Sequence, residues 1–216
     1  NADIEEVRKL PFIKSVHLIR DPRDIIVSGY FSHMKSHPTE GWPELIDHRN
    51  HLIAVSKEDG LHAEIEFSGP TIDLMQTWDY GQKDVLELRY EDVIRDPYTW
   101  LLRAGLHWEL VDERDLKAQD EIRNLMNRGY AVVRRLSRNR VDLQWSVSKV
   151  PAPTFLEIAY KHRFERNSKG RKRGQEDTAS HYRKGVAGDW KEHFTPEVNA
   201  HFLERFPNLL EKLGYA

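Results

Sequence analysis

The chain has 216 residues, of which 39% are hydrophobic and 31% charged, enough to bury one sizeable core. Its net charge of −2 argues against a general binder of nucleic acids or of membrane surfaces. The lack of cysteine excludes disulfides, thiolate catalysis and cysteine-ligated metals, and no apolar run approaches the roughly 20 residues of a membrane-spanning helix.

The predicted elements are many helices and two short strands. In chain order we expect a helix at 3–10, a buried strand at 13–19, helices at 22–36 and 42–57, a turn at 58–60, a helix ending near residue 80 with a break at 68–70, a strand at 85–88, a helix at 97–107, a surface helix at 112–137, a helix within 151–166, a basic loop at 167–177, and a final helix at 196–213 that Gly214 stops. Strands among helices predict a helix-rich α/β layer fold. Without an internal repeat, residues 1–216 are expected to form a single domain.

The end of the first predicted strand is a candidate anion site. Asp21 and Pro22 suit the N-cap and first position of a helix, directly after Arg20. A guanidinium beside a helix N-terminus supplies a planar cationic fork and free backbone donors, which suit a phosphate. The structural alternative is an ion pair of Arg20 with Asp21 or Asp24.

Two further segments carry a family resemblance. Tyr90-Glu91-Asp92 follows the second strand, and Arg183-Lys184-Gly185 with Gly188-Asp189-Trp190 stands near the C-terminus. Together with Arg20 and Ser28, they resemble the cytosolic-type sulfotransferase family, whose members transfer a sulfonate from 3′-phosphoadenosine 5′-phosphosulfate (PAPS) to an acceptor hydroxyl or amine. The resemblance implies a three-layer parallel sheet of the nucleotide-kinase-like (P-loop) type.

The resemblance also implies how the 3′-phosphate of PAPS is held. Arg20 would supply two charge-assisted hydrogen bonds and Ser28 a third. Arg183, Lys184 and Gly185 would close over the same phosphate, with glycine letting the backbone approach the ligand. Taken singly, Ser28 is better explained as a solvent-facing or back-bonded helical serine, and the Arg-Lys-Gly triplet as an exposed loop.

Two aromatic side chains are the expected adenine contacts. Tyr90 resembles the family tyrosine that lies against the base, although a half-buried core tyrosine is the alternative. Phe164 is the expected second contact, with Phe155 as the competing choice. An aromatic residue at helical spacing can equally belong to the core.

The family's donor loop and its catalytic base have no counterpart in this sequence. No Pro-Lys-Ser/Ala-Gly-Thr-Thr loop or Walker-type motif occurs, and His17 falls within the predicted strand. We therefore expect the phosphate-loop lysine and the catalytic histidine to lie upstream of an N-terminally incomplete chain, which by itself would not transfer sulfonate. The alternative functions are a non-catalytic binding module for a 3′-phosphorylated adenine nucleotide and a nucleoside kinase.

The remaining expectations concern metals and partners. His33 and His37 are four residues apart, but Pro38 follows and no third ligand is evident, so no metal is expected. The basic run 171–173 is interpreted as a solvated loop. The acceptor stays open among small molecules, lipids and carbohydrates, with three candidate lining residues: Trp42, His62 and Phe67. Pro196 and Ala200 replace the valine and glutamate of the family's dimer contact, which favours a monomer. A cytoplasmic location is expected, with an upstream targeting segment left open.

Overall fold

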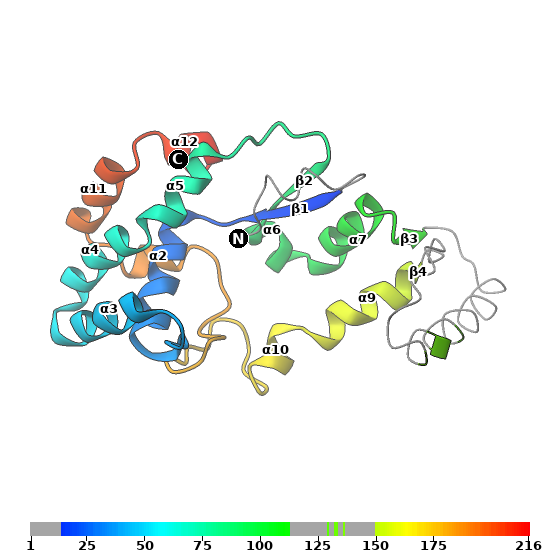
Figure 1. The fold of residues 1–216 in the computed structure, drawn as a ribbon, viewed down its shortest axis with the longest axis horizontal. Helices are drawn as coiled ribbons and strands as arrows, with labels where there is room; N and C mark the ends of the chain where they lie inside the picture. The colour runs from blue at the N-terminus through cyan, green and yellow to red at the C-terminus, as the bar shows by residue number, and fades with distance from the viewer. Residues whose placement is uncertain (1–13, 113–128, 130–131, 134–135, 137–149) are drawn as a thin grey trace. The chain divides into compact units, whose positions relative to one another are not determined.

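The computed structural model describes residues 14–112, 129, 132–133, 136 and 150–216. The helix expected at 3–10 lies outside these residues, and the one at 112–137 does so apart from isolated positions. The elements are β1 (Ser15–Ile19), α2 (Pro22–Phe31), the π-helix η1 (Ser32–Ser36), α3 (Pro43–Ala54), α4 (Lys57–Phe67), α5 (Gly69–Thr77), β2 (Val85–Arg89), α6 (Tyr90–Arg95), α7 (Pro97–His107), β3 (Val111–Asp112), β4 (Val150–Pro151), α9 (Ala152–Lys161), α10 (Phe164–Asn167), the 3₁₀-helix η2 (Asp189–Glu192), α11 (Pro196–Arg205) and α12 (Leu209–Leu213) (Figure 1).

The strands pair in two small sheets among these helices. β1 is hydrogen-bonded to β2, and β3 runs parallel to β4 with Val111 opposite Val150. The helix-rich α/β class with a parallel sheet is thereby confirmed. None of the helices in the described ranges has the length and apolar composition required to cross a membrane.

The contacts divide the chain into two compact units. Of the described residues, the first takes those within 14–17, 83–88, 95–112 and 150–162, and the second takes 18–82, 89–94 and 163–216. In the first unit α7 packs against α9 and β3. The single domain expected over 1–216 stays a prediction.

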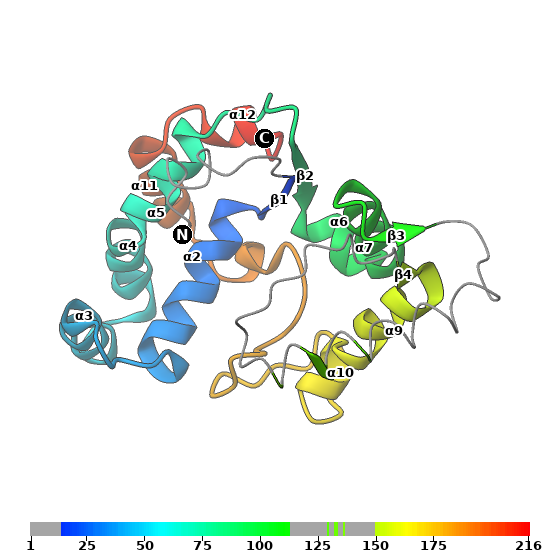
Figure 2. The ribbon, with the colours of Figure 1, turned by 45° about the vertical axis from the view of Figure 1, so that its right-hand side comes forward.

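The hydrophobic core of the second unit lies among its helices. Helix α4 contacts α2, α3, α5 and α11 (Figure 2). The fully buried apolar side chains include Ile26, Val27, Leu61, Ile65, Ile72, Val198, Phe202, Phe206 and Leu209. This packing fixes α2, which begins beside Arg20.

Helix starts with an Asp-Pro or Thr-Pro pair were predicted correctly. The side chain of Asp21 accepts a hydrogen bond from the Arg23 amide, and Pro22 takes the first helical position of α2. The same arrangement starts α7 at Asp96 and α11 at Thr195. These starts are local, because the cap bonds to amides two or three residues further along the chain.

Three sequence-based expectations were wrong. The turn expected at 58–60 is the first part of α4, because Ser56 caps the Asp59 amide and a Cβ at Gly60 would lie 2.6 Å from the Tyr30 ring. Gly60 thus permits close packing inside a helix. The final helix divides into α11 and α12, because Asn208 adopts a left-handed φ of 63°. Strand β1 is only partly buried, with Leu18 51% exposed.

Candidate anion-binding site

Arg20 lies between the end of β1 and the N-cap of α2. Its Nη2 is 3.5 Å from the carbonyl oxygen of Val186 and 3.6 Å from Asp24 Oδ2, both long contacts. Its guanidinium carbon lies 4.6 Å from the centroid of the Tyr90 ring. Its Nε is buried and has no hydrogen-bond partner among the described residues. A buried donor without a partner is uncommon and suits an anion that is not part of the chain.

One pocket brings Arg20 and Ser28 together. It has a volume of about 310 Å³, and both residues line it. Its wall also contains the aromatic rings of His33, His37, Trp42 and Phe67. Arg20 and Ser28, eight residues apart in the sequence, therefore line the same cavity.

Two of the three candidate acceptor-lining residues belong to that pocket. The Trp42 and Phe67 rings are stacked with their centroids 5.5 Å apart. His62 does not line it, because its Nδ1 lies 2.8 Å from Nδ1 of His201 in α11.

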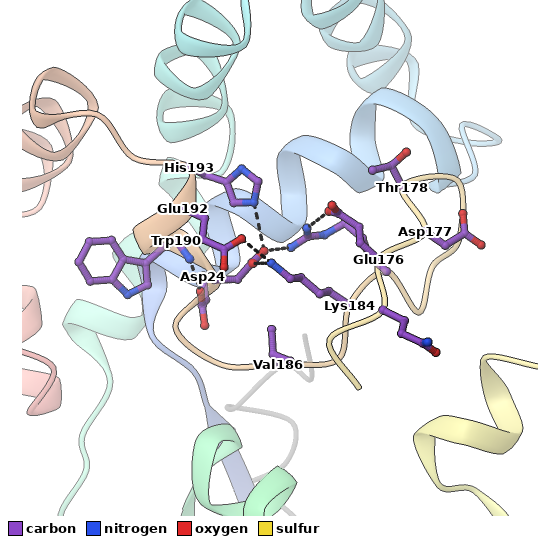
Figure 3. Close-up of polar contacts among 12 residues, drawn as sticks. Asp24, Glu176, Asp177, Thr178, Lys184, Val186, Trp190, Glu192 and His193 are labelled. Atoms are coloured by element: carbon purple, nitrogen blue, oxygen red, sulfur yellow. Dashed lines mark hydrogen bonds and ion pairs between the residues drawn. The ribbon is translucent and has the colours of Figure 1, made fainter. Parts of the chain in front are cut away.

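The cations of the C-terminal motif are paired with carboxylates. Arg183 forms ion pairs with Glu176 and Asp189, while Lys184 Nζ lies 2.5 Å from Asp189 Oδ1 and 2.6 Å from Glu192 Oε2 (Figure 3). The Arg183 guanidinium carbon also lies 4.5 Å from the ring centroid of Phe31, the last residue of α2. The structure thus places Arg183 at the C-terminal end of the helix that begins beside Arg20.

Asp189 is the centre of this ion cluster. Burial alone would raise the pKa of its carboxyl, but the contact with His193 and the hydrogen bonds from Lys184 and Arg183 outweigh burial and hold that pKa well below its usual range. The same contact with Asp189, together with Glu192, raises the pKa of Lys184. Both groups are therefore charged at neutral pH, and a phosphate at this loop would have to share or exchange their partners.

Asp24 anchors the loop that carries the motif. Its Oδ2 accepts a hydrogen bond of 2.7 Å from the Gly188 amide, and its Oδ1 accepts one of 2.9 Å from the Trp190 amide. The side chain is almost fully buried; burial raises its pKa, while Arg20 and the two amides act in the opposite direction. Sequence reasoning considered Asp24 only as a partner of Arg20 and missed this role. No local sequence pattern could indicate this role, because the two amides lie 164 and 166 residues from Asp24 in the chain.

The two aromatic candidates Phe164 and Phe155 belong to different units. Phe164 begins α10 and is buried against Gly185, where φ is +67° and a Cβ would lie 2.5 Å from the ring. Phe155 in α9 packs against Gly105 of α7 in the first unit. The structure thus joins Phe164 to the Arg-Lys-Gly motif.

The sequence predicts that the basic run 171–173 is a solvated loop, but Arg171 in this run is bonded to the backbone. Arg171 donates hydrogen bonds to the carbonyl oxygens of Gln175, Tyr182 and Arg183, at 3.0, 2.7 and 2.8 Å. Arg171 therefore holds in place the segment that leads into the Arg-Lys-Gly motif. His17 lies in β1, with its Nδ1 2.8 Å from Glu87 Oε2 of β2.

A cluster of His33, His48 and Glu64 was also missed. These residues come from η1, α3 and α4, and they are joined by hydrogen bonds. Their sequence separations of 15 and 16 residues match no helical or metal-ligand spacing, so no sequence signal could have found them.

Part of the chain is similar to a known protein family. Residues 6–104 match the family model described as the sulfotransferase domain, a range that contains Arg20, Ser28 and Tyr90. No curated protein matches the chain. Among solved structures, the mouse sulfotransferase SULT7A1 complexed with PAP is 16% identical over 91% of this chain and 58% of that chain, with a TM-score of 0.42. This chain thus spans 58% of the length of that structure.

Proposed function

We propose that this chain, whose residues 6–104 match the sulfotransferase domain, is a sulfotransferase that binds PAPS and serves to transfer its sulfonate to an acceptor hydroxyl or amine. One observation carries the proposal: the guanidinium of Arg20, with its Nε buried and unpaired among the described residues, lines the same pocket as Ser28. This arrangement offers a cationic fork and a hydroxyl to a single phosphate.

The 3′-phosphate of the donor would be the group held there. The phosphate would complete the hydrogen bonding of Arg20, whose present contacts with Val186 and Asp24 are long. Tyr90, with its ring beside the Arg20 guanidinium, would offer its edge or free face to the adenine. Arg183 and Lys184 would reach the phosphate by exchanging carboxylate partners, and Phe164 would support them from beneath Gly185.

Transfer would proceed by in-line attack of the acceptor on sulfur. A bond forms between the acceptor atom and sulfur, the bond from sulfur to the bridging phosphate oxygen breaks, and adenosine 3′,5′-bisphosphate leaves with that electron pair. The acceptor's proton passes to a general base. No residue of this sequence is assigned to that base or to the lysine at the bridging oxygen, so this chain's part in the proposal is donor binding.

The acceptor and the setting belong to the same proposal. The stacked Trp42 and Phe67 rings support an acceptor with an apolar or planar part, of small-molecule, lipid or carbohydrate type. The resemblance to cytosolic-type members supports a cytoplasmic location. Pro196 and Ala200 support a monomer.

Calorimetric titration tests donor binding directly. The protein is titrated with adenosine 3′,5′-bisphosphate and with 5′-AMP, which lacks the 3′-phosphate. We expect the bisphosphate to bind at least about tenfold more tightly, because a hydrogen bond to a charged group contributes roughly 1.5–3 kcal/mol. Arg20→Ala should remove most of that difference.

A matched control and a turnover assay complete the test. Arg103→Ala removes the same charge from an exposed side chain of α7 that stacks on Trp100, and it should bind both nucleotides as wild type does. Equal affinity of the wild type for the two nucleotides would contradict the proposal. If the bisphosphate is bound but the natural protein that carries this sequence never turns over labelled PAPS, the binding-module alternative is correct instead.

A further inference from the structure

Three polar side chains from three helices meet beneath the pocket wall. His33 Nδ1 lies 3.0 Å from each carboxylate oxygen of Glu64, and His48 Nε2 lies 2.8 Å from Glu64 Oε2. One ligand atom from each residue lies within 4.8 Å of the other two. Two imidazole nitrogens and a carboxylate oxygen thus converge on one small volume.

The surrounding side chains hold these three donors in orientation. The His48 ring is stacked on Phe67 with centroids 3.8 Å apart and an interplanar angle of 3°. Ser68 Oγ donates a hydrogen bond of 2.5 Å to Glu64 Oε1, and Arg49 Nε donates one of 2.6 Å to the His33 carbonyl oxygen. Outer contacts of this kind fix ligand orientation in metal sites.

The carboxylate of Glu64 needs a positive partner. It is 0% exposed, and its partners in the described part of the chain are two imidazoles and one hydroxyl, with no lysine or arginine. A divalent cation would take the place of the protons shared with the imidazoles and would balance the buried charge.

We propose that His33, His48 and Glu64 form a binding site for a divalent metal of the zinc type. Two imidazoles and one carboxylate match the ligands that Zn²⁺ takes in sites with three protein ligands, and Co²⁺ accepts the same donors. His33 and Ser68 also line the pocket, so the proposed site adjoins that space. The metal would join η1, α3 and α4 on one side of the pocket.

This site was not expected from the sequence, which predicts no metal. The spacing considered there was His33 with His37, but the structure selects partners 15 and 31 residues beyond His33. His37 lines the pocket, and its ring centroid lies 5.5 Å from that of His33. The inference is independent of nucleotide binding.

Titration of the chelator-treated protein with Co²⁺ alone tests the proposal. We expect visible d–d absorption that saturates at one equivalent and disappears when Zn²⁺ is added. Zn²⁺ should also raise the melting temperature, because it binds the folded state. Glu64→Gln and His48→Gln should each weaken Co²⁺ binding at least about tenfold.

A second histidine group supplies the control. His201 of α11 contacts a different face of α4: its Nδ1 lies 2.8 Å from His62 Nδ1, and its Nε2 lies 2.8 Å from Glu66 Oε1. His201→Gln should therefore leave Co²⁺ binding unchanged. If the variants fold poorly, X-ray absorption fine structure at the zinc edge is measured on the zinc-loaded wild type. Two imidazole nitrogens are expected at about 2.0–2.1 Å from the metal, and their absence would contradict the proposal. A flat Co²⁺ titration, retention of binding in both site variants, or its loss in His201→Gln would overturn the proposal.

Discussion

Replacing Asp24 with asparagine should loosen the loop at 185–190 from α2. One buried carboxylate now accepts hydrogen bonds from two backbone amides, those of Gly188 and Trp190, at 2.7 and 2.9 Å. Asparagine keeps one acceptor oxygen and presents an NH₂ group to the other amide. One buried N–H therefore loses its acceptor.

The expected loss is about 2 kcal/mol in the free energy of unfolding. A buried donor without a partner costs about 1–3 kcal/mol, and a hydrogen bond to a charged acceptor contributes about 1.5–3 kcal/mol. Part of this loss is offset, because burial raises the pKa of Asp24 and asparagine carries no charge to desolvate. At about 2–4 °C per kcal/mol for a chain of this size, the melting temperature should fall by about 4–8 °C.

Thermal unfolding followed by circular dichroism measures the effect of Asp24→Asn. Asp73→Asn is the matched control, because it breaks a partly exposed pair with Arg205 (2.8 Å) that should contribute less than about 1 kcal/mol. Affinity for adenosine 3′,5′-bisphosphate should also fall about tenfold in Asp24→Asn, since the loop is no longer held in place. Equal melting temperatures for Asp24→Asn and Asp73→Asn would refute the reasoning.

Two further predictions concern the same loop. Gly185→Ala should weaken binding of adenosine 3′,5′-bisphosphate about tenfold, as measured by calorimetry. The left-handed φ of +67° costs a residue with a side chain about 1–2 kcal/mol, and the new Cβ would meet the Phe164 ring. Unchanged affinity would argue against a role of this turn in binding the nucleotide. The depressed pKa of Asp189 means that its stabilisation is complete above its ordinary value of 3.8 and is lost as the pH falls toward the folded-state value. The difference in the free energy of unfolding between wild type and Asp189→Asn, measured in urea, should therefore narrow as the pH falls from about 4 to about 2. A constant difference would show that the ion cluster does not stabilise the fold.

Local signals predicted much of the fold. The starts of α2, α7 and α11 follow from a capping side chain and a proline at the first position, which act within one turn. The start of α4 could not be predicted in this way. Gly60 resembles a turn residue in the sequence, and only the Tyr30 ring packed against it explains a glycine inside the helix.

The candidate site was predictable where its motifs are contiguous. Arg20 and Ser28 share a pocket because one helix carries Ser28 and the residue before its cap is Arg20. The role of Asp24 and the Glu64 cluster depend on contacts between segments far apart in the chain. Such contacts follow from the packing of the helices, which a single sequence does not specify.

The π-helix η1 separates the anion-binding residues from the far wall of the pocket. Its hydrogen bond from the His37 amide to the Ser32 carbonyl oxygen (2.8 Å) spans five residues, so this turn holds one residue more than an α-helical turn. Deleting one residue here would rotate the chain from His37 onward by about 100° relative to α2 and leave Arg20 and Ser28 in place. Changes of length in this single turn would therefore reshape the pocket from His37 onward without moving Arg20 or Ser28. The range of ligands that fit the pocket could then diverge through insertion and deletion as readily as through substitution.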